Sequence, residues 1–191
     1  MTLIVICGAT ATGKSDLAVA LAEKLGGQII NADSMQLYKG MDIGTAKLSM
    51  EERKGIRHHL IDVLSVREEA SVAQYQNDAR NLIDQLLEQS IPAIVVGGTG
   101  LYIKSILDDL NFPDTDPEVR EKIARQAEEL GVDVMHERLT RLDPAAAAAI
   151  PKENVRRVVR ALEVIELTGR PYTANLPRVG STKYPDARQF G

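Results

Sequence analysis

A glycine-rich segment near the start of the chain constrains the fold more than any other feature. Residues 8–15 read GATATGKS and match the phosphate-binding pattern G-x-x-x-x-G-K-[ST] throughout. An apolar run at residues 3–7 precedes the segment, and a helical pattern follows it from about Ser15 to Gly26. The pattern requires this order of strand, loop and helix, so it predicts a phosphate-binding loop after the first strand of an α/β core.

The residue types of this loop explain its chemistry. Glycines let the backbone curl so that successive N–H groups point at phosphate oxygens, and the helix N-terminus adds its dipole. Lys14 supplies a positive charge, and the Ser15 hydroxyl can bind Mg²⁺. We therefore expect a di- or triphosphate ligand, Mg²⁺ as cofactor and Ser15 as the metal ligand. The predicted phosphate-binding residues are Gly8, Ala9, Thr10, Ala11, Thr12, Gly13, Lys14 and Ser15.

Size and composition are typical of one globular core with a small appended lobe. The 191 residues are 44% hydrophobic and 26% charged. No apolar run reaches the ~20 residues that span a membrane. The single cysteine, Cys7, excludes an internal disulfide and a cysteine zinc cluster. Since the N-terminus leads straight into a strand, we expect no signal peptide. A cytoplasmic location is then the default, and we expect no membrane contact and a monomer.

Strand and helix signals alternate over the first 110 residues. Further strands are predicted at 28–33, 58–63 and 92–96, and residues 71–74 form a capping box that opens a helix. Apolar strands that alternate with helices predict a parallel sheet covered on both faces. We therefore expect a P-loop NTPase-like α/β core at residues 1–110.

The pattern becomes helical after residue 110. Helices are predicted at residues 116–131, 143–150 and 154–168. No run typical of a strand follows them, and residues 170–191 resemble a loop or an unfinished connection. The second domain is therefore placed at residues 111–191, as a helical insertion lobe with an incomplete return to the core.

Charge is distributed unevenly along the chain. The net charge is −4, but residues 151–191 hold eight Lys or Arg and four Asp or Glu, so the first 150 residues carry −8. This asymmetry is consistent with an anionic partner for the later part or with an ordinary solvated surface. On a helical wheel of residues 154–168, apolar side chains share one arc, and Arg156, Arg157 and Arg160 lie opposite. The wheel predicts three guanidiniums free to bind phosphates.

Polar residues also follow two other predicted strands. Asp33 to Gln36 follow the strand at 28–33, and residues 97–100, which include Thr99, follow the strand at 92–96. Ligands of open α/β sheets bind at the carboxyl ends of the strands, so both clusters are expected to face the phosphate loop. Asp33 is then either a general base for a nucleophile or only the cap of a turn.

Together these motifs resemble the tRNA dimethylallyltransferases. The resemblance rests on G-x-T-A-x-G-K-S in the loop, NADSMQLYKGMDIGTAK at 31–47, HHLID at 58–62, GGTGLY at 97–102, RVVRALEV at 157–164 and TG at 168–169. These motifs run in the family's order over about residues 3–170. Ala9 replaces the family's usual proline. Members also continue past residue 191 with a further core strand and helices, so we expect the C-terminal part of the core to be missing. A sheet edge exposed in this way predicts low stability and aggregation.

The resemblance implies a function and a role for each motif residue. Members transfer a dimethylallyl group from dimethylallyl diphosphate to N6 of the adenosine 3′ to the anticodon, position 37 of tRNA. Lys14 and Mg²⁺ on Ser15 would stabilise the diphosphate leaving group, Asp33 would take the proton of the amine, and Thr99 would position a substrate. The catalytic residues that the resemblance implies are therefore Asp33, Thr99 and Lys14. Residues implied to contact the tRNA anticodon stem-loop are Asp33, Ser34, Met35, Gln36, Thr99, Arg120, Arg156, Arg157, Val158, Val159 and Arg160.

Three other functions are consistent with these residues. An adenylate isopentenyltransferase would prenylate free AMP or ATP with related motifs. A P-loop small-molecule kinase would use the same loop for ATP, with the helical lobe as an arginine-bearing lid. An inactive fragment would only bind diphosphate or tRNA. The basic helix and the lobe favour tRNA as the partner.

Overall fold

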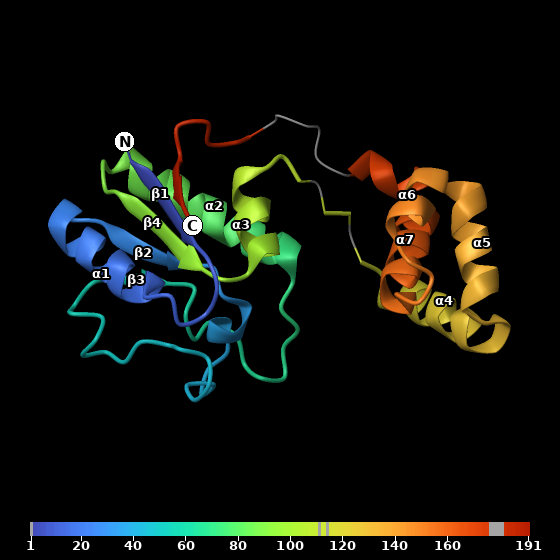
Figure 1. Ribbon diagram of the computed structural model, residues 1–191, viewed down its shortest axis with the longest axis horizontal. Helices are drawn as coiled ribbons and strands as arrows, with labels where there is room; N and C mark the ends of the chain where they lie inside the picture. Colours follow the sequence, from blue (N-terminus) through green and yellow to red (C-terminus); the bar gives the residue numbers. More distant parts are fainter. Residues whose placement is uncertain (1, 111, 114, 176–181) are drawn as a thin grey trace. The chain divides into compact units, whose positions relative to one another are not determined.

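The chain divides into two compact units in the computed structural model, which describes residues 2–110, 112–113, 115–175 and 182–191. The core unit comprises Met1–Asp109 and Gly180–Gly191, and the helical lobe comprises Leu110–Val179. Figure 1 shows the strands gathered in the core unit and four helices of the lobe. The end of the chain thus belongs with the core unit, although the lobe precedes it in the sequence.

The described part of the core unit is built around a five-stranded sheet with strand order β3-β2-β4-β1-β5. Every strand pair in it is parallel. The strands are β1 (Leu3–Cys7), β2 (Gln28–Asn31), β3 (His58–His59), β4 (Ala93–Gly97) and β5 (Arg188–Phe190). The predicted parallel α/β class is therefore confirmed.

Helices cover both faces of this sheet because successive strand residues point to opposite sides. Ile4 and Ile6 of β1 pack with α1 (Lys14–Leu25) on one face. Val5 lies on the other face, in one apolar cluster with residues of α2 (Val72–Glu88) and α3 (Gly100–Leu107). Burial on both sides explains why β1 and β4 are apolar at every position.

Three strands differ from the prediction. β2 ends at Asn31, two residues earlier than expected. β3 has only two residues where six were expected, because Leu60 and Asp62 adopt left-handed φ values of 57° that end the strand. β5 was not predicted at all. Its three residues are exposed and pair with Ile4–Ile6 at the edge of the sheet. An exposed edge strand has no need of the apolar run on which strand prediction relies.

Several contacts hold the chain end against the rest of the core unit. The Lys183 N–H donates to the Leu107 carbonyl at 2.8 Å, and the Tyr184 hydroxyl donates to Asp84 Oδ1 at 2.7 Å. The end of the chain is therefore a return to the sheet, and β5 is the strand beside β1. The low stability expected for an exposed edge stays a prediction.

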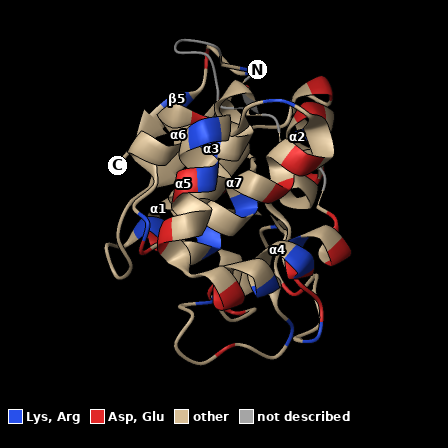
Figure 2. Cartoon of the chain, turned by 90° about the vertical axis from the view of Figure 1, so that its right-hand side faces the viewer, with Lys and Arg blue, Asp and Glu red and all other residues tan. Residues whose placement is uncertain are grey.

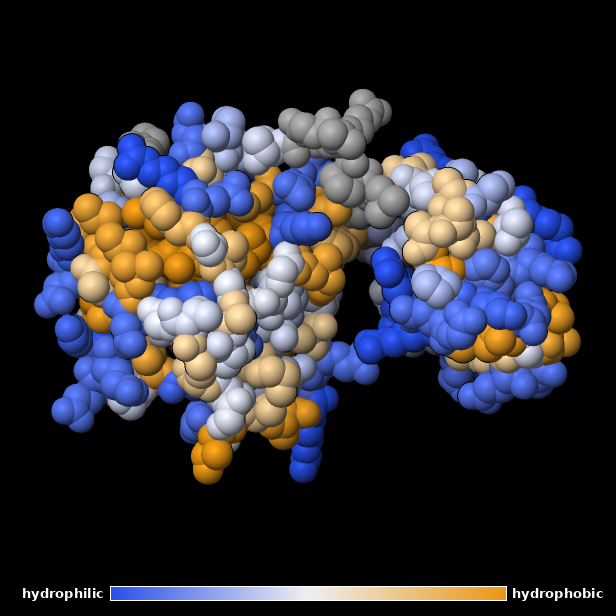
Figure 3. Space-filling model, in the orientation of Figure 1, coloured by the Kyte–Doolittle hydropathy of each residue, from blue (hydrophilic) through white to orange (hydrophobic). Residues whose placement is uncertain are grey.

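Several large apolar side chains remain exposed on the core unit. Ile43 is 98% exposed, Met50 76%, Val66 65% and Phe190 52%. Figure 3 shows apolar residues, in orange, gathered on the visible face of this unit. Exposed apolar surface of this kind commonly causes protein molecules to associate with one another.

The helical lobe consists of helices that pack around its own apolar core. The core includes Ile123, Leu139, Ile150 and Leu162. The helices are α4 (Pro117–Leu130), α5 (Val132–Leu142), α6 (Pro144–Ala149), α7 (Val155–Thr168) and the short η2 (Tyr172–Asn175). No helix in the described ranges is long and apolar enough to cross a membrane.

Cap residues explain why α4, α6 and α7 were predicted from the sequence and α5 was not. The side chains of Asp116, Asp143 and Asn154 each accept a backbone N–H in the first turn of α4, α6 and α7. Gly169, with φ 64°, ends α7. By contrast, α5 begins directly after Gly131 without a side-chain cap, so the sequence carries no start signal for it.

A buried carboxylate ties α7 to the start of the lobe. The side chain of Glu163 is fully buried, and Arg120 Nε and Arg160 Nη1 each lie 3.0 Å from its Oε2. The Asp116 N–H donates to Oε1 of the same carboxylate at 3.1 Å. Such a charge is tolerated in a core because every partner it needs is present.

Replacing Glu163 with alanine is therefore expected to destabilise the lobe by about 2 kcal/mol, the scale of lost hydrogen bonds to a charged group. Glu166 on the same helix is the matched control. It also contacts two cations, Lys122 and Arg138, but it is 30% exposed. Its replacement with alanine should cost less than about 1 kcal/mol. Urea unfolding measures both changes, and equal losses would contradict the special role of Glu163.

Candidate functional site

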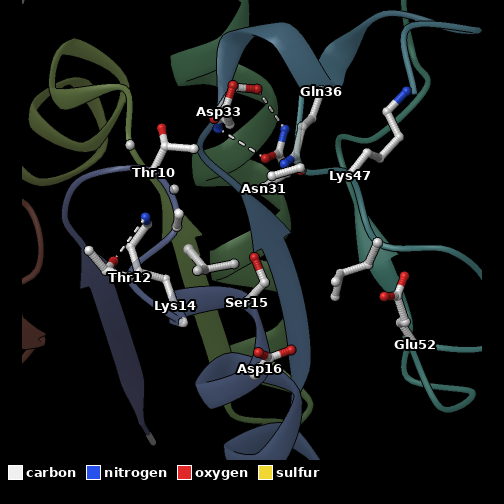
Figure 4. A pocket seen from close by; sticks show the side chains of 17 residues that line it. Thr10, Thr12, Lys14, Ser15, Asp16, Asn31, Asp33, Gln36, Lys47 and Glu52 are labelled. Atoms are coloured by element: carbon white, nitrogen blue, oxygen red, sulfur yellow. Dashed lines mark hydrogen bonds between the residues drawn. The ribbon is translucent and has the colours of Figure 1, made fainter. Parts of the chain in front are cut away.

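A cavity of about 340 Å³ lies at the carboxyl end of the sheet. Its walls come from the loop after β1, the ends of β2 and β4, and the long loop that follows η1 (Ser34–Leu37). Figure 4 labels its polar lining, which is Thr10, Thr12, Lys14, Ser15, Asp16, Asn31, Asp33, Gln36, Lys47 and Glu52. This is the edge at which parallel α/β sheets bind ligands.

The Lys14 ammonium contacts other residues of the phosphate loop. Lys14 Nζ donates to the Ala9 carbonyl and lies 3.4 Å from Thr12 Oγ1, which itself donates to the Ala9 carbonyl at 2.9 Å. Gly13 caps α1 with φ 78°, and Ala11 is also left-handed with φ 63°. The positive charge thus sits next to a helix N-terminus, where an anion is favoured.

Most of the predicted phosphate-binding residues line the cavity. These are Thr10, Ala11, Thr12, Gly13, Lys14 and Ser15. Gly8 and Ala9 are not part of the lining. Gly8 has φ 148° and begins the turn, whereas Ala9 supplies the carbonyl that binds Lys14. Their contact with a phosphate stays a prediction.

Asp33 caps a turn and lines the cavity at the same time. It is half-buried, and its Oδ1 accepts the Met35 N–H at 3.0 Å at the start of η1. In the described part of the chain, no hydrogen bond reaches its Oδ2. The two interpretations of Asp33 are therefore compatible, because one oxygen caps the turn and the other can accept a proton.

Thr99 joins the end of β4 to the segment that follows Asp33. Its Oγ1 accepts the Ser34 N–H at 3.0 Å and lies 3.4 Å from Ser34 Oγ. Gln36 lines the cavity and donates from Nε2 to the Thr45 carbonyl at 2.9 Å. Ser34, Met35 and Thr99 do not line the cavity, so the structure places them beside it.

Lys47 lines the cavity, and although it ends the motif at 31–47, the sequence alone assigned it no role. Only 3% of its side chain is exposed, and Nζ donates to the Tyr38 carbonyl at 2.9 Å, to Asp42 Oδ1 at 2.8 Å and to Asp62 Oδ1 at 2.7 Å. Burial is the largest single effect on the pKa of Lys47 and by itself lowers it. The hydrogen bonds and charges of Asp42 and Asp62 together outweigh burial, so the pKa of Lys47 is raised. This cluster fixes the long loop against the residues after β3.

The lobe arginines differ from the wheel prediction at one position. Arg160 Nη1 pairs with Glu163, and Nη2 donates to the Pro113 carbonyl at 2.8 Å. The prediction of three free guanidiniums is therefore wrong for Arg160, because a wheel cannot show what another segment places against the helix. Arg120 pairs with Glu163 as well.

The remaining predicted tRNA contacts fall into two groups. Arg156 and Arg157 are exposed, and neither forms an ion pair with any described residue. Figure 2 shows basic residues, in blue, along α7. The side chains of Val158 and Val159 are buried in the lobe core, at 2% and 7% exposure. RNA contact by any of the four stays a prediction, and the burial of the two valine side chains argues against contact through them.

Known proteins are similar to this chain over nearly its full length. The IPP transferase family model matches residues 36–190. A tRNA dimethylallyltransferase from Streptomyces griseus is 57% identical over 189 residues, which are 99% of this chain and 60% of that protein. Another, from Saccharopolyspora erythraea, is 59% identical over 185 residues, 95% of this chain and 59% of that protein. The chain therefore spans about three fifths of the length of these relatives.

Solved structures are similar as well. A eukaryotic dimethylallyltransferase acting on tRNA superposes with a TM-score of 0.83 at 31% identity, covering 98% of this chain and 47% of that one. The tRNA isopentenylpyrophosphate transferase of Bacillus halodurans gives a TM-score of 0.58 at 45% identity, covering 90% of this chain and 57% of that one. With the phosphate loop and Asp33 on one cavity, these similarities show that the chain belongs to the IPP transferase family.

Proposed function

We propose that this chain carries the transfer site of a tRNA dimethylallyltransferase. The site would move a dimethylallyl group from dimethylallyl diphosphate to N6 of the adenosine at position 37 of tRNA, 3′ to the anticodon. One observation carries the proposal: the phosphate loop with Lys14 and the carboxylate of Asp33 line the same cavity. A diphosphate donor and an amine acceptor could therefore meet there.

The residues of the cavity match the charge changes of this reaction. As N6 attacks C1 of the dimethylallyl group, the N–C bond forms, the C–O bond breaks and negative charge grows on the departing diphosphate. Lys14 and the N-terminus of α1 would stabilise that charge where it develops. The proton of N6 would pass to Asp33 Oδ2. Holding both substrates in one cavity itself lowers the barrier.

The donors of the cavity fit a Mg²⁺ ion bound together with substrate. The described residues contain no group of three or more His, Cys, Asp or Glu side chains that could hold a metal by themselves. Mg²⁺ commonly takes one or two protein oxygens and completes its shell with phosphate and water. Ser15, which lines the cavity, would supply the protein oxygen. The ion would neutralise charge on the diphosphate.

The lobe would bind the anticodon stem-loop through its basic helix. Arg156 and Arg157 would contact phosphates, and the target adenosine would leave its stack to reach the cavity. We further propose that the protein acts as a monomer in the cytoplasm.

Replacing Arg156 and Arg157 with glutamine should therefore weaken tRNA binding and its dependence on salt. Each lost phosphate contact reduces the magnitude of the slope of log affinity against log salt by about 0.7 to 0.9. The slope of the double variant should therefore be smaller in magnitude by about 1.5. Arg141 on α5 is exposed, and Arg141→Gln is the control for the loss of a surface charge. Filter binding at several salt concentrations measures the slopes. An unchanged slope in the double variant would remove α7 from the interface.

A transfer assay tests the proposed reaction. The chain is incubated with labelled dimethylallyl diphosphate, Mg²⁺ and unmodified tRNA, with AMP and ATP as parallel acceptors. Label in tRNA that depends on Asp33 would support the proposal. Label in AMP or ATP would instead assign the site to the free-nucleotide prenyltransferases. A folded chain that labels no acceptor would reject transfer by this chain.

A further inference from the structure

Asn31 makes an unusual set of contacts two residues before Asp33. Its side chain lies at the end of β2, and the residue is 2% exposed. Oδ1 accepts the Asp33 N–H at 2.9 Å. Nδ2 donates to the Asp33 carbonyl and to the Leu60 carbonyl, both at 2.9 Å. One buried amide therefore satisfies both backbone polar groups of Asp33 (Figure 4).

The amide is itself firmly anchored. Asn31 pairs with Val96 in the sheet, and its carbonyl accepts the buried Tyr75 hydroxyl at 2.8 Å. Leu60, its third partner, has the left-handed φ that ends β3. The position of Asn31 is thus set by β4, by α2 and by the residue that follows β3.

This arrangement determines where the Asp33 carboxylate points. A side chain's direction follows from the backbone that carries it, and the Asn31 amide holds the N–H and the carbonyl that flank the Asp33 Cα. Asp33 Oδ1 is then fixed by the Met35 N–H, and because Asp33 lines the cavity, Oδ2 is the carboxylate oxygen left to accept a proton there. Without the amide, two partly buried carbonyls and one N–H would need other partners, and the turn would loosen.

We propose that Asn31 is a positioning residue for Asp33, which it holds in the orientation that lets Oδ2 accept the substrate proton. The inference rests on the proposed function for its catalytic part. Asn31 lines the cavity, but it acts through the backbone of Asp33.

Amide hydrogen exchange tests the positioning without any substrate. The variant is Asn31→Leu, which is close in volume but forms no hydrogen bond. Exchange at Asp33 and Met35 should become at least about tenfold faster, while amides of α1 and α2 stay unchanged. Equal acceleration throughout the core unit would show a purely structural role and overturn the proposal.

Gln28→Leu is the matched control. Gln28 lies at the other end of β2 and also makes a side-chain contact toward β3, between its Oε1 and His59 Nε2 at 2.7 Å. This variant should leave exchange at Asp33 and Met35 unchanged. If Asn31→Leu does not fold, Asn31→Ala gives the same comparison, because alanine has neither the acceptor oxygen nor the N–H donors of the amide.

Transfer kinetics test the catalytic part. In Asn31→Leu, kcat should fall about 10- to 100-fold, whereas KM for dimethylallyl diphosphate should change less than about twofold because Lys14 is untouched. In an Asp33→Asn background the same substitution should cause no further loss. A loss that persists there would overturn the proposal. A wild-type chain without transfer would reject the proposed function instead, and the exchange experiment would still decide whether Asn31 positions Asp33.

Discussion

Asp33→Asn is expected to lower kcat for dimethylallyl transfer about 10²- to 10⁴-fold, the usual contribution of a general base. Asparagine has the same size, and its carbonyl oxygen can still accept the Met35 N–H that Oδ1 now accepts at 3.0 Å. The turn at the start of η1 should therefore survive, and only the basic oxygen is lost. KM for dimethylallyl diphosphate should change little, because the phosphate loop supplies that binding.

Glu52→Gln is the matched control for this variant. Glu52 lines the same cavity, but its Oε2 already accepts the N–H and the hydroxyl of Ser49, both at 2.7 Å. Those hydrogen bonds from Ser49 lower the pKa of Glu52, which makes it a poor proton acceptor. The control should keep kcat within about tenfold of the wild type. A similar kcat in Asp33→Asn and the wild type would show that Asp33 is not the base, and a large rise in KM would indicate a binding role instead.

Sequence was sufficient for the parts of the site that depend on neighbouring residues. A phosphate loop is defined by eight consecutive positions between a strand and a helix, so Lys14 and Ser15 could be placed before any fold was known. Asp33 could be placed because the ends of parallel strands meet at one edge. The caps of α4, α6 and α7 were predictable for the same reason, since each acts within one turn.

The residues that sequence missed depend on partners far along the chain. Lys47 and Asp62 are fifteen residues apart, and Asn31 and Leu60 are twenty-nine apart. A helical wheel likewise described the polar side of α7 but not the hydrogen bond from Arg160 Nη2 to the Pro113 carbonyl, forty-seven residues away. Periodicity reports which side of an element faces water, and it carries no information about which other segment lies against that side.

Gly97→Ala is expected to destabilise the core unit by about 3 kcal/mol, at the upper end for an overpacked site. A Cβ at this position would lie 2.2 Å from the carbonyl carbon and oxygen of Ala32 and 2.8 Å from its Cα. These are backbone atoms, so no rotamer change can relieve the clash. The Ala32 N–H donates to the Val96 carbonyl at 2.7 Å, and the Ala32 carbonyl accepts the Thr99 N–H at 3.1 Å, which locks the two strands together.

Gly100→Ala is the control, because it should not lower the free energy of unfolding. A Cβ at Gly100 would meet nothing within 4 Å, and this glycine opens α3 without a positive φ. Alanine is the better helix former, so the change should be neutral or stabilise by up to about 1 kcal/mol. Urea unfolding followed by circular dichroism measures both variants. Equal stability of Gly97→Ala and the wild type would mean that β2 and β4 can separate without cost. The close contact that brings Asp33 beside the end of β4 would then be incidental to the site.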